Sequence, residues 1–301
     1  MDNYLITIVG PTAIGKTSLS IEIAKHFNTE IISSDSRQFF KEMEIGTAVP
    51  CIEELAIIKH HFIQNISIHD TYSVGQFEKD AISKLNELFT NHNHVVMVGG
   101  SGLYTNAVLN GLDNFPKIDS TIRINLKNQL KEVGMLPLQD QLKKLDLKTY
   151  QKIDIDNHQR LIRALEICIG TGKPYSSFLT NTSIQRNFIP IKIGLTADRE
   201  IIYNRINQRV DIMMENGLLN EVKELLEYKH LNALQTVGYK ELFSYLENEI
   251  TLEFAIEEIK KNTRRFAKRQ LTWYRKDDEI KWFNYKEDKK QLIIDYINQR
   301  K

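Results

Sequence analysis

The sequence predicts an α/β protein in which a parallel sheet is flanked by helices and interrupted by a mainly helical insertion. Two observations support this fold class. Apolar runs rich in β-branched residues alternate with helical patterns early in the chain, disappear from its middle, and return after it. A chain of 301 residues also reaches the length, roughly 250–300 residues, at which a single hydrophobic core stops growing. We therefore expect a first part of the core at residues 1–112, an insertion at 113–190, and a second part of the core at 191–301.

The first part of the core shows an alternation of strands and helices. Strands are predicted at residues 4–9 (YLITIV), 30–34 (EIISS) and 95–98 (VVMV). Helices are predicted at residues 16–27 and 76–89, where apolar side chains recur at helical spacing. Because the strands are apolar almost throughout, they indicate a parallel sheet buried on both faces.

The middle of the chain has helical patterns and no strand. Helices are predicted at residues 121–133, 136–144 and 157–169, and Pro116 and Pro190 bracket this stretch. These features predict a separate helical insertion, which leaves the sheet to be completed by the segment that follows it.

The second part of the core returns to the α/β pattern. A strand is predicted at residues 191–195 (IKIGL), followed by a long amphipathic helix from Arg199. Two further helical stretches follow, of which residues 252–274 are the longer, and residues 280–283 are expected to form a last strand.

Composition excludes several classes of protein. Apolar residues make up 42% and charged residues 26%, which is typical of a globular domain and excludes a disordered chain. Cys51 and Cys168 do not have the spacing of a zinc site, and we expect both thiols to be buried. No apolar run approaches the ~20 residues of a membrane span, and the N-terminus has no basic segment of a signal peptide. A cytoplasmic protein without membrane contact is expected.

The clearest motif is GPTAIGKT at residues 10–17, which fits the phosphate-loop pattern G-x-x-x-x-G-K-[ST]. It lies between a predicted strand and a predicted helix, as that pattern requires. Backbone N–H groups and the helix N-terminus would face an anion, Lys16 would add a cation, and Thr17 could offer its hydroxyl to Mg²⁺. The motif predicts a P-loop NTPase-like sheet and a polyphosphate ligand, without deciding which polyphosphate.

Two further segments follow predicted strands. Asp35 comes after the second strand, and residues 99–102 (GGSG) come after the third. Because the carboxyl ends of parallel strands meet at one edge, these segments should lie beside the phosphate loop. Asp35 could bind metal, act as a base or cap a turn, and the glycines could form a plain turn or admit a ligand beside the hydroxyl of Ser101.

A basic helix is predicted at the end of the chain. Residues 259–276 contain eight cationic and no acidic side chains: Lys260, Lys261, Arg264, Arg265, Lys268, Arg269, Arg275 and Lys276. Spacings of four place many of them in two adjacent stripes, where like charges repel. We expect Ile259, Phe266 and Trp273, at intervals of seven, to face the core. The charge predicts a nucleic-acid or diphosphate partner, although a solvated face remains an alternative.

Together, the ordered motifs of the chain resemble the tRNA dimethylallyltransferase family, also called the tRNA isopentenyltransferases, in its short bacterial form. The resemblance rests on the segments GPTAIGKT (10–17), DSRQFFKEMEIGTAVP (35–50), HHFIQ (60–64), YSVGQF (72–77), GGSGLY (99–104), DNHQRLIRALE (156–166), RINQRVDIMMENGLLNEV (205–222), VGYKEL (237–242) and TRRFAKRQLTW (263–273). Ser101 and Phe40 stand where the family commonly has Thr and Tyr.

The resemblance implies transfer of a dimethylallyl group from dimethylallyl diphosphate to N6 of an adenosine in tRNA. That adenosine lies immediately 3′ of the anticodon in tRNAs reading codons that begin with U, so the anticodon stem-loop is the implied partner. The phosphate loop would hold the donor's diphosphate, with Mg²⁺ as cofactor, although its motif also fits ATP. A monomer is expected.

The resemblance also assigns site residues. Asp35, Ser101 and Lys16 would be catalytic, with Asp35 as the base that takes the proton of the amine. The diphosphate would contact Gly10, Pro11, Thr12, Ala13, Ile14, Gly15, Lys16, Thr17 and Arg209. The tRNA would contact Asp35, Ser36, Arg37, Gln38, Ser101, Arg123, Gln159, Arg160, Leu161, Ile162 and Arg163. Surface ion pairing is an alternative for Arg160 and Arg163, and His60 and His61 have no assigned role.

Three other functions fit part of the sequence. A phosphate-loop kinase of a small metabolite would explain the first 100 residues but not the basic helix or the insertion. A prenyltransferase acting on a free adenine nucleotide would share the core chemistry but would need no extended cationic surface. An RNA-binding protein with a relic loop would not need Lys16, Thr17 and Asp35 intact.

Overall fold

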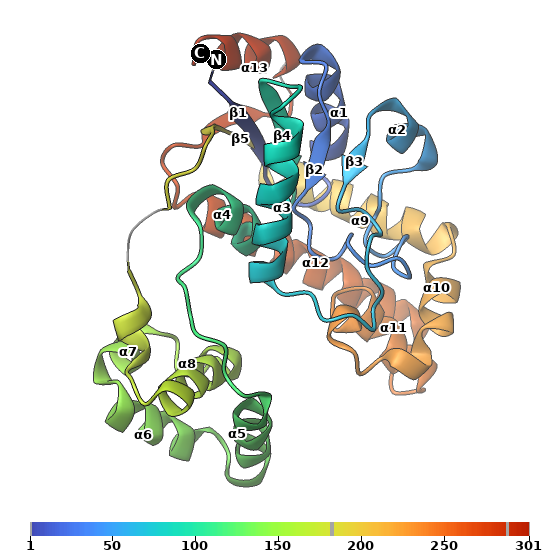
Figure 1. Cartoon of the computed structure of the whole chain (residues 1–301). Coiled ribbons are helices and arrows are strands. Elements are labelled where there is room, and N and C mark those ends of the chain that lie inside the picture. The colour runs from blue at the N-terminus through green and yellow to red at the C-terminus, as the bar shows by residue number, and fades with distance from the viewer. Residues whose placement is uncertain (1, 181–183, 287–288, 301) are drawn as a thin grey trace. The chain divides into compact units, whose positions relative to one another are not determined.

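The structure, a computed structural model, describes residues 2–180, 184–286 and 289–300 (Figure 1). The chain forms two compact units: Met1–Asn110 with Gln185–Lys301, called the core unit below, and Gly111–Ile184, called the insertion unit. The insertion was expected at residues 113–190. Residues 185–190 belong to the core unit, because the strand after the insertion begins at Ile189, so that Pro190 lies inside it.

The core unit is built on a parallel sheet in the order β3-β2-β4-β1-β5-β6. Its strands among the described residues are β1 (Tyr4–Val9), β2 (Ile31–Ser33), β3 (His60–His61), β4 (His94–Val98), β5 (Ile189–Thr196) and β6 (Lys281–Asn284). All but the two-residue β3 were predicted, to within two residues at each end. Because every strand runs in the same direction, the segments after β1, β2 and β4 emerge at one edge of the sheet.

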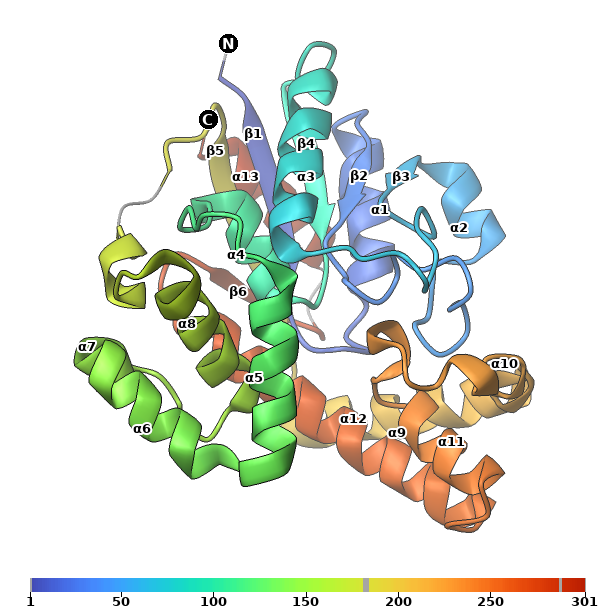
Figure 2. The ribbon, with the colours of Figure 1, turned by 60° about the horizontal axis from the view of Figure 1, so that its bottom comes forward.

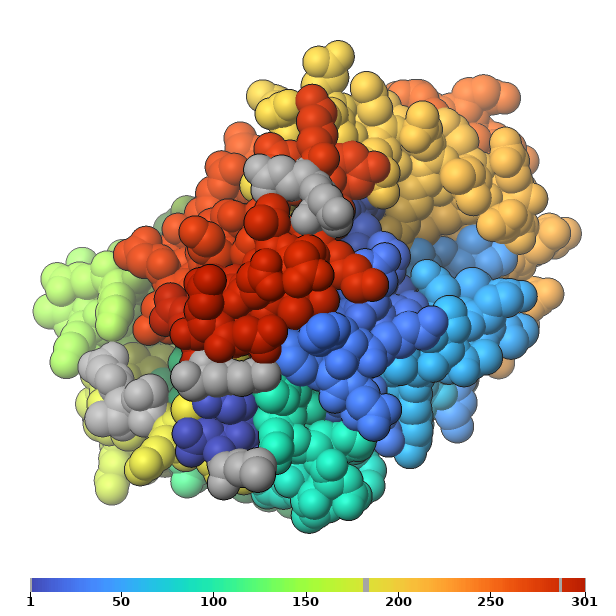
Figure 3. All heavy atoms as spheres, turned by 90° about the horizontal axis from the view of Figure 1, so that it is seen from above, coloured from blue at the N-terminus to red at the C-terminus, as the bar shows by residue number. Residues whose placement is uncertain are grey.

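Helices cover both faces of this sheet (Figure 2). One face packs against α1 (Lys16–His26), α9 (Arg199–Glu215) and α13 (Lys289–Asn298). The other packs against α3 (Val74–Leu88) and α4 (Gly102–Asn110). Figure 3 shows α13, in red, beside the blue N-terminal segment that contains α1. The sequence interpretation missed α4 and α13.

A second cluster of buried residues extends the core unit beyond the sheet. It joins α9 to α10 (Leu218–Glu224), α11 (Tyr239–Leu246) and the first half of α12 (Leu252–Tyr274). The remaining helix of this unit outside the clusters, α2 (Ile52–Ile57), begins after Cys51. We expected both cysteines to be buried. Cys168 is buried, but Cys51 is exposed, because it caps this short surface helix.

The insertion unit consists of helices, as its sequence pattern predicted. These are α5 (Ser120–Val133), α6 (Met135–Leu145), α7 (Leu147–Lys152) and α8 (His158–Thr171), followed by a single 3₁₀ turn at Tyr175–Phe178. Their apolar sides form a core of their own around α8. The six-residue α7 was missed because it is too short to show a helical period. It is held by Asp146, whose side chain accepts hydrogen bonds at its N-terminus.

The long helix α12 was predicted with the correct bounds, but its buried face was predicted wrongly. Ile259 is buried, whereas Phe266 and Trp273 are 38% and 43% exposed. Seven residues fall short of two full turns, so a row at that spacing drifts around a straight helix. The buried row continues instead through Ala267 and Tyr274.

Candidate functional site

The segments that follow β1, β2 and β4 meet at the carboxyl edge of the sheet and line one cavity of about 940 Å³. The phosphate loop contributes Thr12 to Thr17, and the other two segments contribute Asp35 and Ser101. Helices α9 and α12 close the cavity with Arg209 and Phe266, among others. The sequence interpretation placed the three segments together for the same topological reason that the structure displays.

The phosphate loop turns tightly around a backbone that presents N–H groups. Ala13 and Gly15 have φ angles of 63° and 96°, a left-handed conformation that produces the concave turn of an anion-binding loop. Gly10 is required for another reason: a Cβ atom there would lie 2.6 Å from the carbonyl oxygen of Leu195. Arg205 supports the strained position, since its Nε donates to the Ala13 carbonyl oxygen at 2.6 Å.

Two cations, Lys16 and Arg209, line the cavity. The pKa of Lys16 is lowered to about 8. Burial is the largest cause, Asp35 acts in the opposite direction, and Arg209 adds to the lowering. Burial also lowers the pKa of Arg209. Among the described residues neither cation has an ion-pair partner within 4 Å, and Lys16 Nζ donates instead to the Pro11 carbonyl oxygen at 2.8 Å. Two desolvated cations at a loop of N–H groups suit a polyanionic ligand.

Asp35 uses one carboxylate oxygen for structure. Its Oδ1 accepts from the backbone N–H of Arg37 at 3.2 Å, so turn capping, one of the alternatives at this position, does occur. Its Oδ2 lies near the glycine turn, where a Cβ atom at Gly100 would be 3.5 Å from it. Ser101 ties the two segments together, because its Oγ accepts from the N–H of Ser36 and shares a second hydrogen bond with the Ser36 hydroxyl, both at 3.0 Å.

Two of the expected tRNA contacts have partners within the core unit. Arg37 Nη1 donates to the carbonyl oxygens of Asn232 and Ala233 at 2.9 and 2.7 Å. Gln38 Nε2 donates to the carbonyl oxygens of residues 47 and 48, and its Oε1 accepts from Ser33 Oγ. A glutamine amide bonded at both ends holds the segment after β2 in place.

In the insertion unit, some of the expected tRNA contacts are buried or paired within the unit and others are exposed. Leu161 and Ile162 are buried, at 0% and 4% exposure, so their side chains are part of the helical core and not of a contact surface. Arg123 and Arg163 both pair with the buried carboxylate of Glu166, at 2.9 and 3.0 Å. The ion pairing that was an alternative for Arg163 is therefore present. Gln159 and Arg160 are exposed at the start of α8.

The basic helix has partners for its first cations. Lys260 pairs with Asp211 at 2.9 Å and with Glu257, and Lys261 pairs with Glu258 at 2.6 Å. Part of the charge is therefore used in ion pairs within the protein, beside any partner that the sequence predicted. Further along the helix Lys268 and Arg269 are exposed, and among the described residues neither forms an ion pair. Arg269 lines the cavity.

The sequence interpretation missed Gln270 and Arg205. Gln270 lies on the buried face of α12 and bonds to both the phosphate loop and the glycine turn. Both residues fall inside motifs that carry the family resemblance, but a glutamine beside a run of cations and an arginine on an amphipathic helix give no separate signal.

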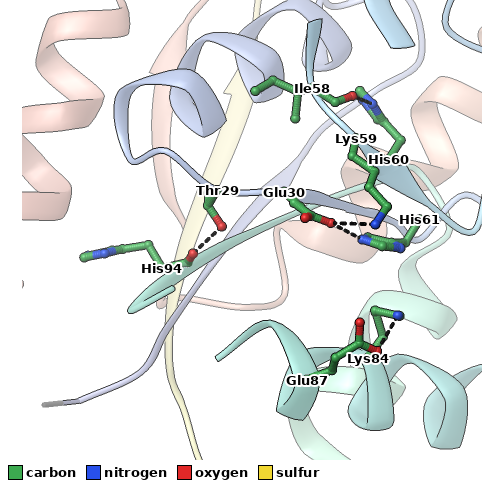
Figure 4. Close-up of polar contacts among 9 residues, drawn as sticks. All are labelled: Thr29, Glu30, Ile58, Lys59, His60, His61, Lys84, Glu87 and His94. Carbon is green, nitrogen blue, oxygen red and sulfur yellow. Dashed lines mark hydrogen bonds and ion pairs between the residues drawn. The ribbon is translucent and has the colours of Figure 1, made fainter. Parts of the chain in front are cut away.

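His60 and His61, which had no assigned role, lie on the edge strand β3 (Figure 4). His61 Nε2 contacts Glu30 Oε2 at 2.5 Å, and Lys59 approaches the same carboxylate oxygen at 3.6 Å. His60 Nδ1 bonds to the Ile58 carbonyl oxygen, and burial lowers the pKa of both imidazoles. The His61 pair fastens β3 to the adjacent strand, whereas His60 lines the cavity.

Comparison with known proteins identifies the family. A family model described as IPP transferase matches residues 38–277. The tRNA dimethylallyltransferase of Christiangramia forsetii is 64% identical over 300 residues, covering 100% of this chain and 99% of the relative. That of Flavobacterium johnsoniae is 59% identical and covers 96% of each chain.

Solved structures support membership of the same family. The full-length tRNA isopentenylpyrophosphate transferase of Bacillus halodurans superposes with a TM-score of 0.73 at 38% identity, covering 99% of this chain and 96% of that one. A eukaryotic dimethylallyltransferase acting on tRNA gives a TM-score of 0.83 at 26% identity, covering 99% and 80%. With matches of this extent and a phosphate-loop cavity that joins Lys16, Asp35 and Arg209, the chain belongs to the IPP transferase family.

Proposed function

We propose that the chain transfers the dimethylallyl group of dimethylallyl diphosphate to N6 of the adenosine immediately 3′ of the anticodon, in tRNAs that read codons beginning with U. One observation carries the proposal. A loop built for a polyanion, two desolvated cations and a carboxylate share a single cavity. That arrangement suits a reaction in which a diphosphate leaves and an N–H group loses its proton.

The leaving group is served by the phosphate loop. As the C–O bond to the donor breaks, negative charge grows on the diphosphate, and preorganised donors stabilise such charge most where water is excluded. The N–H groups after Ala13, the ammonium of Lys16 and the guanidinium of Arg209 would hold it. No phosphoryl group moves, so the loop acts here on a leaving group and ATP has no part in the reaction.

The nucleophile is served by Asp35. The exocyclic amine of adenine is weak because its lone pair is delocalised into the ring, so removal of its proton as the C–N bond forms assists the reaction. General-base help of this kind is typically worth about 10²–10⁴-fold. Asp35 Oδ2, beside the turn of Gly100, is the oxygen suited to take that proton, since Oδ1 already caps a turn. Ser101 would position the same region of the substrate.

The apolar part of the cavity would bind the prenyl group. Ile206, Val210, Ile259 and Phe266 line it on the side of α9 and α12. A wall of this kind would bind a five-carbon chain through its apolar surface and keep water away from the carbon under attack, which protects the donor from hydrolysis.

Mg²⁺ fits the site only together with the diphosphate. Among the described residues no group of three or more His, Cys, Asp or Glu side chains could hold a metal ion. Mg²⁺ usually keeps several waters and binds through few protein oxygens and substrate phosphates. Thr17, which lines the cavity after Lys16, supplies such an oxygen. Bound there, the ion would neutralise charge on the leaving group.

The tRNA would be held by both units. A base inside a helical stack cannot reach a buried carboxylate, so the target adenosine must be turned out into the cavity. Exposed cations suited to its phosphates are Lys268 and Arg269 in the core unit and Arg160 in the insertion unit.

The catalytic groups all belong to the core unit of a single chain, which supports action as a monomer. No helix among the described residues could span a membrane. We place the reaction in the cytoplasm, because tRNA is available there.

The test is prenyl transfer in vitro. Unmodified tRNA, labelled dimethylallyl diphosphate and Mg²⁺ are incubated with the protein and with Asp35→Asn as control, and separate reactions replace tRNA by AMP or the donor by ATP. Label should enter tRNA only, and Asp35→Asn should transfer it about 10²–10⁴-fold more slowly. Transfer of label to AMP would indicate a free-nucleotide prenyltransferase. Hydrolysis of ATP during the reaction would indicate a kinase. If no label enters tRNA, the proposal is wrong.

A further inference from the structure

One buried side chain connects the two loops that the proposed reaction must hold in register. Gln270, on α12, is only 5% exposed. Its Oε1 accepts from the backbone N–H of Thr12 in the phosphate loop at 2.9 Å. Its Nε2 donates to the carbonyl oxygen of Gly100, in the turn after β4, also at 2.9 Å.

The fit around this amide is close and specific. A Cβ atom at Gly100 would lie 2.3 Å from Gln270 Nε2, so the amide occupies the space that a side chain there would need. One end of the bridge requires an acceptor and the other a donor, and a glutamine amide supplies both. An apolar side chain of the same length would leave a partly buried N–H and a buried carbonyl without partners, which is costly at each.

The two loops serve opposite ends of the proposed reaction. Thr12 belongs to the loop that would bind the leaving diphosphate, and Gly100 lies beside Asp35 Oδ2, with Ser101 next in the chain. In a displacement the nucleophile, the carbon and the leaving group must be aligned, and a misplacement of about 1 Å can cost about 10²-fold in rate. The separation of these loops therefore matters more for the rate than for the binding of either substrate.

We propose that Gln270 is a positioning residue, which fixes the distance between the diphosphate loop and the region of the general base. The inference rests on the proposed function. Gln270 does not line the cavity and would act through its bonds to Thr12 and Gly100.

The experiment compares Gln270→Met and Gln270→Glu with the parent. Gln270→Met keeps the length and removes both hydrogen bonds. We expect its kcat to fall by about 10–10²-fold, while the KM values for tRNA and dimethylallyl diphosphate change by less than about threefold. Thr29→Val is a matched control, because it removes a partly buried hydrogen bond to the His94 carbonyl oxygen (Figure 4), at the end of the strands opposite to the cavity. It should lower the melting temperature and leave kcat unchanged.

Gln270→Glu adds a readout that a purely structural role would not give. When ionised, the carboxylate can accept from Thr12 but repels the Gly100 carbonyl oxygen. When protonated, it can donate to that oxygen as the amide does. Burial raises the pKa of such a carboxyl group, so the kcat of Gln270→Glu relative to the parent should rise as the pH is lowered. Dividing by the parent removes the pH dependence that both proteins have in common.

The outcomes separate the two proposals. A parent without prenyl transfer to tRNA contradicts the proposed function, whatever Gln270 does. An active parent whose Gln270→Met variant keeps its kcat, or whose Gln270→Glu variant gives a ratio independent of pH, overturns the positioning role. If Gln270→Met does not fold, the pH-dependent ratio of Gln270→Glu decides alone.

Discussion

The lowered pKa of Lys16 predicts how the affinity for diphosphate changes with pH. In the free protein burial brings this pKa to about 8, so about nine-tenths of the ammonium is charged at pH 7 and about one-tenth at pH 9. A bound diphosphate raises the same pKa, because it places negative charge beside the ammonium. Binding therefore takes up a proton above pH 8, and affinity must fall as the pH rises.

The magnitude follows from these fractions. If only the charged form of Lys16 binds the anion strongly, the affinity for pyrophosphate drops about tenfold between pH 7 and pH 9, and the slope approaches one logarithmic unit per pH unit above 8. Isothermal titration of the protein with magnesium pyrophosphate, in buffers of matched ionic strength, measures this directly.

The control is Lys16→Arg, whose guanidinium stays charged throughout this range. Its absolute affinity will differ, since the side chain is larger, but the pH dependence due to position 16 should vanish. The titration of pyrophosphate itself is common to both proteins and cancels in their difference. Equal pH dependence in the parent and in Lys16→Arg would refute the assignment of a desolvated lysine to the diphosphate.

Three further predictions concern other parts of the site. Asp35→Asn preserves the oxygen that caps the turn at residue 37 but cannot take a proton. Its single-turnover rate constant should therefore fall by about 10²–10⁴-fold, while the tRNA affinity, measured by filter binding, changes little. Arg209→Gln should weaken pyrophosphate binding in the same titration without changing tRNA affinity, and unaltered pyrophosphate affinity would remove Arg209 from the diphosphate site. Lys268→Gln should make the log–log slope of tRNA affinity against salt concentration shallower by about 0.7–0.9. Lys260→Gln should change that slope by much less, because Lys260 is already paired with an aspartate. Equal slopes for the two variants would contradict a contact between Lys268 and a tRNA phosphate.

The sheet and the place of the site could be predicted because both follow from local patterns. Continuous apolar strands require burial on both faces, and a phosphate loop must stand between a strand and a helix. Parallel strands then bring Asp35 and Ser101 to the edge where Lys16 lies. Elements with too few residues to show a period, such as α7 and β3, carried no comparable signal.

The use of individual side chains could not be predicted, because it depends on contacts distant in the sequence. Arg37 was expected at the tRNA, but its guanidinium reaches two carbonyl oxygens almost 200 residues further along the chain. Arg163 pairs with Glu166 three residues away, yet a neighbouring acid in sequence does not reveal that the carboxylate is buried and also held by Arg123. Motifs thus identify a residue without telling which partner its side chain has.

Helix α12 combines a feature that the sequence revealed with side-chain contacts that it did not reveal. Its cations were visible in the sequence, but their periodicity could not tell that Lys260 and Lys261 are used in ion pairs near the start of the helix. Further along, the exposed Lys268 stands two residues before Gln270, which bonds to both loops of the cavity. The part of the helix that remains available to a phosphate backbone is therefore the part that holds the phosphate loop against the turn beside Asp35. A polyanion bound at Lys268 would lie within one helical turn of the amide that sets this separation.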